Sequence, residues 1–169
     1  ILGQITNMTF QPTGIKVGEM VVPIGVIFMI YESRPNVTID SACLSIKSGN
    51  AIILRGGSES FFTNTLLYKS IRQSLKKNNL PPNLVQYLKS ANRDLINEIL
   101  KKDEYVDLVI PRGGKNLIRS VINNSSIPVL KHLDGVCHLY IDSYANESMA
   151  LKLTINSKTQ RLSTCNTLE

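Results

Sequence analysis

Two glycine turns flanked by cations are the first candidates for chemistry in this sequence. They are Arg55-Gly56-Gly57-Ser58-Glu59 and Pro111-Arg112-Gly113-Gly114-Lys115. In each turn the glycines let backbone approach a ligand closely, and a cation stands beside the N–H groups of an expected helix start, a combination that favours phosphate. Neither turn is a GxGxxG or Walker loop, and a glycine turn with a solvated Arg explains each one equally well. Taken together they favour a nucleotide.

The three cysteines are an odd count at wide spacing without a CxxC pair, so they predict neither a disulfide framework nor a zinc site. Cys165 lies among polar residues with Lys158 and Arg161 close in sequence, which favours an exposed loop and a readily formed thiolate. Cys43 and Cys137 sit in apolar helix and strand patterns, so we expect both to be buried packing residues. This cysteine usage fits a reducing cytoplasm.

Buried strands alternate with helices along the chain, and helices of this length between strands imply right-handed crossovers. One expected strand ends at Tyr31, and the others cover 51–54, 85–88, 106–110 and 136–141. The expected helices cover about 37–48, 58–75, 92–101, 115–125 and 147–155. A short extended piece is expected at 128–130. The predicted fold is therefore α/β, a Rossmann-like, mostly parallel sheet with helices on both faces. Both glycine turns then lie at the carboxyl ends of strands, where such sheets bind ligands.

The composition limits the class of protein. A chain of 169 residues that is 43% hydrophobic can form one domain with a core. It has 6% aromatic residues and no Trp, and its net charge of +6 comes from cations spread along the chain, so we expect no nucleic-acid partner. No apolar run reaches the ~18 residues of a membrane span. We therefore expect a soluble protein and, because the chain opens on Ile1 without an initiator Met, a fragment.

Five stretches of the chain closely resemble gamma-glutamyl phosphate reductases, a family of the aldehyde dehydrogenase superfamily. The stretches are Tyr31–Thr38, Ser48–Gly57, Leu108–Gly114, Gly135–Asp142 and Asn156–Thr167. The resemblance implies an aldehyde dehydrogenase cofactor-binding domain for NADP over residues 1–156, incomplete at its N-terminus. It also implies that residues 157–169 begin a catalytic domain with its nucleophile loop.

The resemblance also implies the reaction, which is the NADPH-dependent reduction of L-glutamate 5-phosphate to L-glutamate 5-semialdehyde in cytoplasmic proline biosynthesis. Cys165 stands at the position of the family's nucleophile, which attacks the acyl phosphate, expels phosphate and forms a thioester that hydride then reduces. Asn36 corresponds to the amide that stabilises the oxyanion. Without the resemblance, a turn or helix cap after Pro35 is the better interpretation of Asn36.

The cofactor residues follow from the same resemblance. Arg55 occupies the place where related dehydrogenases carry a Lys that reaches the adenosine ribose, and a guanidinium there suits the 2′-phosphate of NADP(H). Gly56 and Gly57 belong to that turn, whereas Gly113 and Gly114 are candidates for the pyrophosphate cradle, with Arg112 nearby. Arg34 is a candidate for the anionic substrate, and a salt bridge to Glu32 or Asp40 is an equally good interpretation.

One departure bears on the reaction direction. Ordinary aldehyde dehydrogenases carry a Glu that activates water in a Glu-Leu-Gly-Gly stretch, and this chain has His132-Leu133-Asp134-Gly135 instead. The absence of that Glu favours a reductase, because a water-activating base would hydrolyse the thioester. Asp134 remains an alternative base, and His132 and His138 are expected to be structural.

The resemblance implies that family members extend beyond both ends of this sequence. Two hypotheses therefore stay open: a working reductase, or a truncated chain that binds nucleotide without catalysis. The family further implies a small-molecule substrate, a homo-oligomer in the full-length form and an association with glutamate 5-kinase. No metal and no membrane partner are expected. A missing half would leave an apolar interface exposed.

Overall fold

The computed structural model describes residues 2–90, 92–132, 135–161 and 167–168. The chain divides into two compact units, Ile1–Lys131 and His132–Glu169, which are described separately below. The boundary expected between a cofactor-binding domain over residues 1–156 and the start of a catalytic domain over residues 157–169 stays a prediction.

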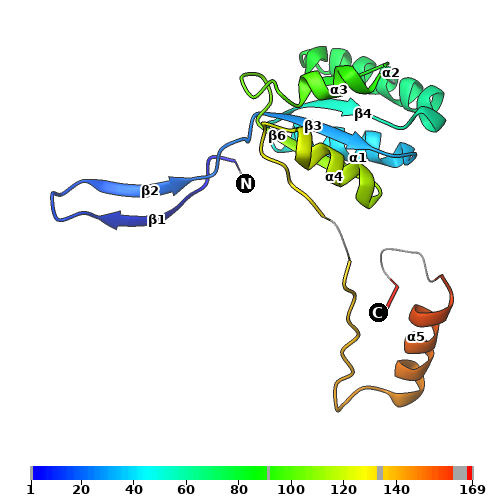
Figure 1. Ribbon diagram of the computed structural model, residues 1–169. Coiled ribbons are helices and arrows are strands. Elements are labelled where there is room, and N and C mark those ends of the chain that lie inside the picture. Colours follow the sequence, from blue (N-terminus) through cyan, green and yellow to red (C-terminus); the bar gives the residue numbers. More distant parts are fainter. Residues whose placement is uncertain (1, 91, 133–134, 162–166, 169) are drawn as a thin grey trace. The chain divides into compact units, whose positions relative to one another are not determined.

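A four-stranded parallel sheet forms the centre of the first unit (Figure 1). Its strands are β3 (Val26–Tyr31), β4 (Ala51–Arg55), β5 (Val85–Tyr87) and β6 (Leu108–Arg112), in the spatial order β5-β4-β3-β6. All three pairings are parallel, so the predicted parallel α/β sheet is confirmed. The order reverses at β3, whose carboxyl end lies between those of β4 and β6.

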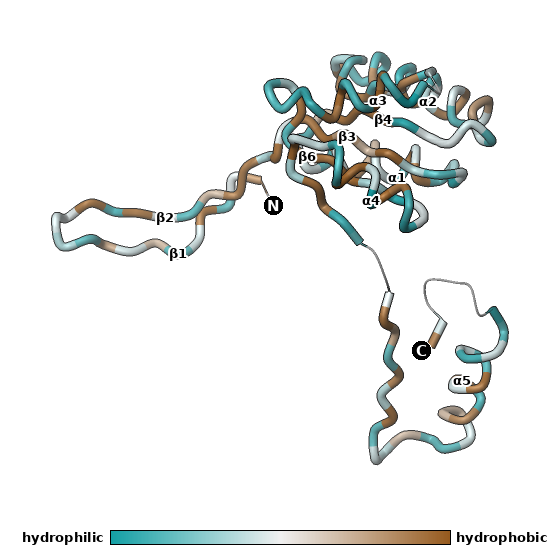
Figure 2. Tube along the Cα trace, viewed as in Figure 1, coloured by the Kyte–Doolittle hydropathy of each residue, from teal (hydrophilic) through white to brown (hydrophobic). Residues whose placement is uncertain are grey.

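Helices cover both faces of this sheet, as the sequence predicts. They are α1 (Pro35–Lys47), α2 (Phe61–Lys77), α3 (Arg93–Ile99) and α4 (Lys115–Asn124), with short 3₁₀ turns at η1 (Ser58–Ser60) and η2 (Pro82–Leu84). Alternate residues of β3 enter two separate cores, because successive strand side chains point to opposite faces. Ile27 and Tyr31 pack with α1 and α2, whereas Phe28 and Ile30 pack with α3 and α4. Figure 2 shows apolar strands between helices that carry many polar residues.

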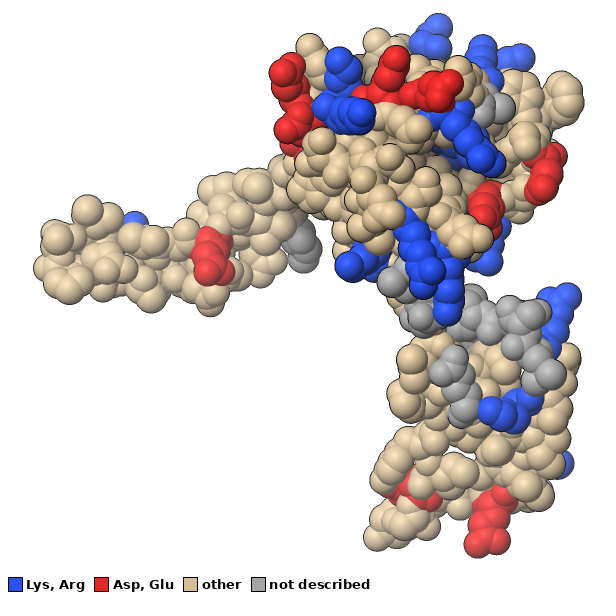
Figure 3. Space-filling view, in the orientation of Figure 1, with Lys and Arg blue, Asp and Glu red and all other residues tan. Residues whose placement is uncertain are grey.

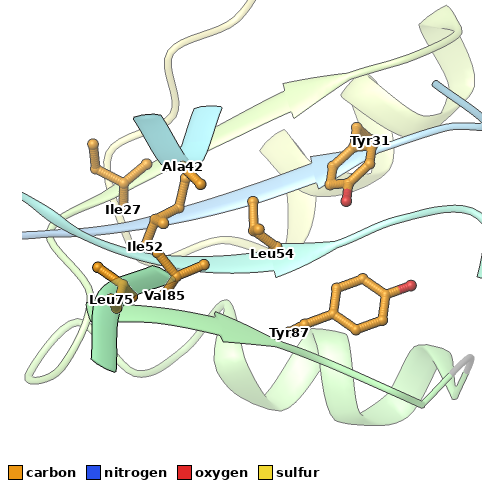
Figure 4. Packing of buried hydrophobic residues seen from close by; sticks show 8 residues of the cluster. All are labelled: Ile27, Tyr31, Ala42, Ile52, Leu54, Leu75, Val85 and Tyr87. Carbon is orange, nitrogen blue, oxygen red and sulfur yellow. The ribbon is translucent and has the colours of Figure 1, made fainter. Parts of the chain in front are cut away.

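The core against α1 and α2 is aliphatic near the amino ends of the strands and aromatic near their carboxyl ends (Figure 4). Tyr31 and Tyr87 lie at the carboxyl ends of β3 and β5. Burying one such apolar side chain is worth about 1.5–3 kcal/mol. The packed core therefore fixes the positions of the strand ends and of the turns that follow them.

The buried faces of α1 and α2 are not the ones that the apolar spacing of the sequence predicts, which would bury Cys43 of α1 and Phe62 and Leu66 of α2. Cys43 is exposed, and the expectation that it is buried was wrong, because α1 turns its small polar residues inward. Phe62 and Leu66 of α2 are 86% and 68% exposed. The residues that these helices do bury are Thr38, Ser41, Ala42 and Ser45 on α1, and Asn64 and Leu75 on α2.

An antiparallel hairpin precedes the sheet and was not predicted. It pairs β1 (Ile5–Phe10) with β2 (Lys16–Met20), and every residue of both strands is exposed. The turn contains Pro12 and Gly14, whose φ of 83° lies in the left-handed region that favours glycine. A Pro-Thr-Gly turn between short segments with β-branched residues was the available signal.

The second unit contains the helix α5 (Glu147–Thr159), which confirms the predicted start of the last helix. The Asn146 Oδ1 atom caps it by accepting a hydrogen bond from the Met149 N–H at 3.0 Å. The predicted strand at Val136–Ile141 was wrong, because this apolar segment has no strand partner within the described part of the unit. No described helix of either unit is long and apolar enough to cross a membrane.

Candidate functional site

A polar pocket of about 470 Å³ opens where β3 and β4 end. Three arginines line it, namely Arg34 at the start of α1, Arg55 at the end of β4 and Arg93 at the start of α3. Glu32 and Glu59 contribute the carboxylates of the same pocket. This is the edge at which an open α/β sheet with a reversed strand order binds its ligand.

A second pocket of about 420 Å³ continues toward α4 and shares Glu32, Arg55 and Arg93 with the first. The two pockets together follow the carboxyl ends of the sheet from α3 to α4. On the side of this unit seen in Figure 3, cations and anions are intermixed, so that side carries no large surface of one sign. The concentration of arginines is a local property of the pockets.

Arg55 is half-buried, and its Nε atom is buried without a hydrogen-bond partner among the described residues. Burial lowers the pKa of Arg55, because the charged guanidinium is partly removed from water. A buried donor without an acceptor is costly, and an anion entering the pocket would supply one. The structure thus places the predicted cofactor residue Arg55 in the pocket with an unused donor.

Gly56 and Gly57 are crowded by the protein itself. A Cβ on Gly56 would lie 2.3 Å from Asn64 Nδ2 and 3.2 Å from the Tyr31 ring, and one on Gly57 would lie 3.0 Å from Ser33 Oγ. The same Ser33 hydroxyl donates a hydrogen bond to the Glu59 carboxylate. Close packing against Tyr31, Ser33 and Asn64 therefore accounts for both glycines, and their contact with a cofactor stays a prediction.

Gly113 and Gly114 meet the carboxylate of Glu32. The Gly114 N–H donates to Glu32 Oε1 at 3.0 Å, and a Cβ on Gly113 would lie 2.7 Å from Glu32 Cδ. The exposed Arg112 is tied to the same residue through its carbonyl, which accepts from the Glu32 N–H at 3.1 Å. Glu32 thus places a negative charge at the amino end of α4, the end that the helix dipole makes positive.

A buried polar network lies beneath the turn after β4. The Tyr31 and Thr38 hydroxyls are 2.6 Å apart, and Thr38 Oγ1 donates to Asn64 Oδ1 at 3.1 Å. Burial raises the pKa of Tyr31 to about 12, although its hydrogen bond to Thr38 acts in the opposite direction. This network fixes the position of Asn64 and through it the shape of the turn at Gly56.

The predicted catalytic residues are only partly described. Asn36 is exposed on the first turn of α1, and its Nδ2 donates to Asp40 Oδ2 at 3.3 Å. Arg34 forms no ion pair with any described residue, so the alternative salt bridge to Glu32 or Asp40 is absent. Cys165, the predicted nucleophile, lies outside the described residues, as does Asp134.

Two residues of the pockets were missed from the sequence. From the sequence, Glu32 is predicted only as a partner for Arg34, and no role is predicted for Arg93. A signal existed for Arg93, because it follows the helix cap Asn92, whose Oδ1 accepts from the Asp94 N–H at 2.9 Å, just beyond the end of β5. A cation at the start of a helix after a parallel strand points to the same edge of the sheet.

Comparisons with known proteins agree with this picture. No known family model matches the chain. Over 168 residues the chain is 50% identical to the gamma-glutamyl phosphate reductase of Psychrobacter arcticus, covering 99% of this chain and 39% of that protein. The crystal structure of gamma-glutamyl phosphate reductase from Thermotoga maritima has a TM-score of 0.86 at 41% identity, covering 99% of this chain and 41% of the other.

More distant solved structures show the same fold. An engineered glycolyl-CoA reductase with bound NADP+ has a TM-score of 0.70 at 20% identity, covering 90% of this chain and 35% of its own. The chain thus shares its α/β fold with aldehyde dehydrogenases, such as the succinate-semialdehyde dehydrogenase of Burkholderia pseudomallei with a TM-score of 0.71 at 14% identity, and its resemblance to gamma-glutamyl phosphate reductases is confirmed. It spans about two-fifths of the length of these relatives.

Proposed function

We propose that this chain is a segment of a gamma-glutamyl phosphate reductase that binds NADP(H) and contributes the nucleophile to the reduction of L-glutamate 5-phosphate. The observation that carries the proposal is the arginine-lined pocket at the point where the strand order reverses, in a chain half identical to a named reductase. The Arg55 Nε atom, which has no hydrogen-bond partner in the described part of the chain, and the second pocket beyond Glu32 fit a bound dinucleotide phosphate.

The proposed reaction assigns chemistry to two side chains. The Cys165 thiolate attacks the acyl carbon of the substrate, the bond to the phosphate oxygen breaks, and inorganic phosphate leaves a thioester on the sulfur. The Asn36 amide donates to the oxyanion that forms during this attack. The bound nicotinamide cofactor supplies the hydride. The resulting thiohemiacetal releases L-glutamate 5-semialdehyde and regenerates the thiolate.

Asn36 must exchange its acceptor in this scheme, because its Nδ2 donates to Asp40 in the structure. That contact is exposed and 3.3 Å long, so its loss costs little.

In the cofactor site, Arg55 with Gly56 and Gly57 holds the adenosine phosphate end, and Gly113 and Gly114 with Arg112 hold the pyrophosphate. Glu32 then gives up its contact with Gly114.

The reductase proposal is tested in the reverse direction, by following the absorbance of the NADPH that forms when L-glutamate 5-semialdehyde, phosphate and NADP+ are supplied. Activity in the full-length protein and none in this chain alone would assign the chain to nucleotide binding without independent catalysis. Absence of activity in the full-length protein would refute the reductase. Cys165→Ala should abolish turnover and leave NADPH affinity nearly unchanged, and Cys43→Ala serves as the matched control.

The remaining parts of the proposal concern the cellular setting. We propose a cytoplasmic biosynthetic enzyme that acts on a small molecule, forms homo-oligomers and associates with glutamate 5-kinase. Size-exclusion chromatography with light scattering measures the first association, and co-purification with the kinase measures the second. A monomer that does not retain the kinase would remove both partners from the proposal.

A further inference from the structure

The polar pocket is lined by more cationic than anionic side chains. Its two carboxylates have neutral hydrogen-bond donors as partners, since Glu32 accepts from the Gly114 N–H and Glu59 accepts from the Ser33 hydroxyl. Arg55 and Arg93, by contrast, form no ion pair with any residue that the structure describes. Arg34 of the first pocket is likewise unpaired among the described residues, but of the three arginines only Arg55 and Arg93 line both pockets.

These two arginines interact unfavourably with each other. Burial is the main cause of the lowered pKa of Arg55, and the positive charge of Arg93 lowers it further. The buried Arg55 Nε atom also lacks an acceptor among the described residues. A ligand that carries two negative charges on one compact group would relieve both penalties, because planar guanidinium groups bind phosphate oxygens in pairs.

The strand order separates this pair from the second glycine turn. Arg55 ends β4 and Arg93 follows β5, whereas Gly113 and Gly114 follow β6 on the other side of β3. Neighbouring strands are about 4.8 Å apart, so two to three spacings place the arginine pair roughly 10–15 Å from the glycine turn. An extended dinucleotide can reach both places, with a terminal phosphate at one and its pyrophosphate at the other.

We propose that Arg93 and Arg55 together form the binding site for a phosphomonoester dianion, the 2′-phosphate of NADP(H), and that Arg93 thereby determines the choice of NADPH over NADH. This inference rests on the proposed function and adds a specificity residue that neither motif contains. Asn92 supports the assignment, because it caps α3 and fixes Arg93 at the first helical position on the pocket.

The test measures binding of NADPH and NADH to the purified full-length protein by nicotinamide fluorescence, in wild type, Arg93→Ala and Lys101→Ala. Lys101 follows α3, is exposed and lines neither pocket, so its removal matches the change in net charge. Arg93→Ala should weaken NADPH binding at least tenfold and change NADH binding less than twofold. Lys101→Ala should change neither. Arg93→Met keeps the aliphatic stem and should show the same selectivity if Arg93→Ala impairs folding.

Three results would overturn the inference. An equal loss for both nucleotides would give Arg93 a structural role, and unchanged NADPH binding would remove it from the site. An unchanged NADPH affinity with a raised KM for inorganic phosphate in the reverse reaction would assign the arginine to the substrate phosphate. Wild-type protein that binds neither nucleotide would instead refute the proposed function itself, which keeps the two failures distinct.

Discussion

Gly56→Ala tests whether the first glycine turn is shaped by the protein core or by a ligand. The new Cβ would lie 2.3 Å from Asn64 Nδ2 and 3.2 Å from two atoms of the Tyr31 ring. Asn64 is fully buried, and its Oδ1 already accepts from Thr38, so the amide cannot move away without losing that bond. The substitution therefore overpacks a fixed network.

The magnitude follows from two opposing effects. Overpacking of this kind typically costs about 1–3 kcal/mol. The φ of Gly56 lies outside the left-handed region, so alanine also restricts the unfolded chain and returns about 0.4–1 kcal/mol. The expected net loss in the free energy of unfolding is about 1–2 kcal/mol. Gly114→Ala is the matched control, because its Cβ would be in ordinary contact at 3.6 Å from Glu32 Oε1.

Equilibrium urea unfolding of the purified protein, followed by far-UV circular dichroism, measures these differences. Asn64→Ala removes the amide with which the new Cβ of Gly56→Ala would clash, so the two substitutions should be coupled by about 1 kcal/mol in the free energy of unfolding. If Gly56→Ala is as stable as Gly114→Ala, or costs the same with and without Asn64, the reasoning fails. The NADPH affinity of the double variant then distinguishes packing from ligand contact. If Gly56 contacts the ligand, the double variant still binds NADPH weakly. If Gly56 only packs against Asn64, the double variant does not.

Two further predictions concern charge. Since the pKa of Tyr31 is raised from 10.0 to about 12, its contribution to stability is complete below pH 10 and is lost as the pH rises from about 10 to about 12. The loss should be roughly 2–3 kcal/mol by urea unfolding, should shrink in Tyr31→Phe, and would be contradicted by identical pH profiles. Glu32→Gln removes the carboxylate that competes for the Gly114 N–H, so NADPH should bind about two- to fivefold more tightly, or roughly 0.3–1 kcal/mol. Unchanged or weaker binding in a fluorescence titration would contradict this role.

The parallel sheet was predictable because its strands are short aliphatic runs bounded by glycine and proline. The buried faces of α1 and α2 were not, because hydrophobicity suggested Cys43, Phe62 and Leu66 whereas the structure buries Thr38 and Asn64. A hydroxyl and an amide can be buried when they bond to each other, and a pattern of apolar residues does not register that pairing.

The candidate site was predicted in part for a similar reason. Arg55 could be identified because it stands beside a glycine turn at a strand end. Arg93 carried only the weaker signal of a cation at a helix start after a strand, and Glu32 carried none, because the importance of both depends on the meeting of turns that lie far apart in the sequence. The contact between Glu32 and Gly114 joins residues 82 positions apart. Only the strand order, with β6 beside β3, brings them together.

That strand order also has a consequence for folding. β4 and β5 follow β3 closely in the chain, whereas the contact that ties β3 to the start of β6, between the Val26 N–H and Asp107, spans 81 residues. Closing the longer loop costs more chain entropy, and synthesis delivers β6 last. The second pocket, which is lined in part by residues of α4 after β6, is therefore complete only after this final pairing step. A nucleotide that binds there acts on the finished sheet and, by mass action, holds its last strand in place.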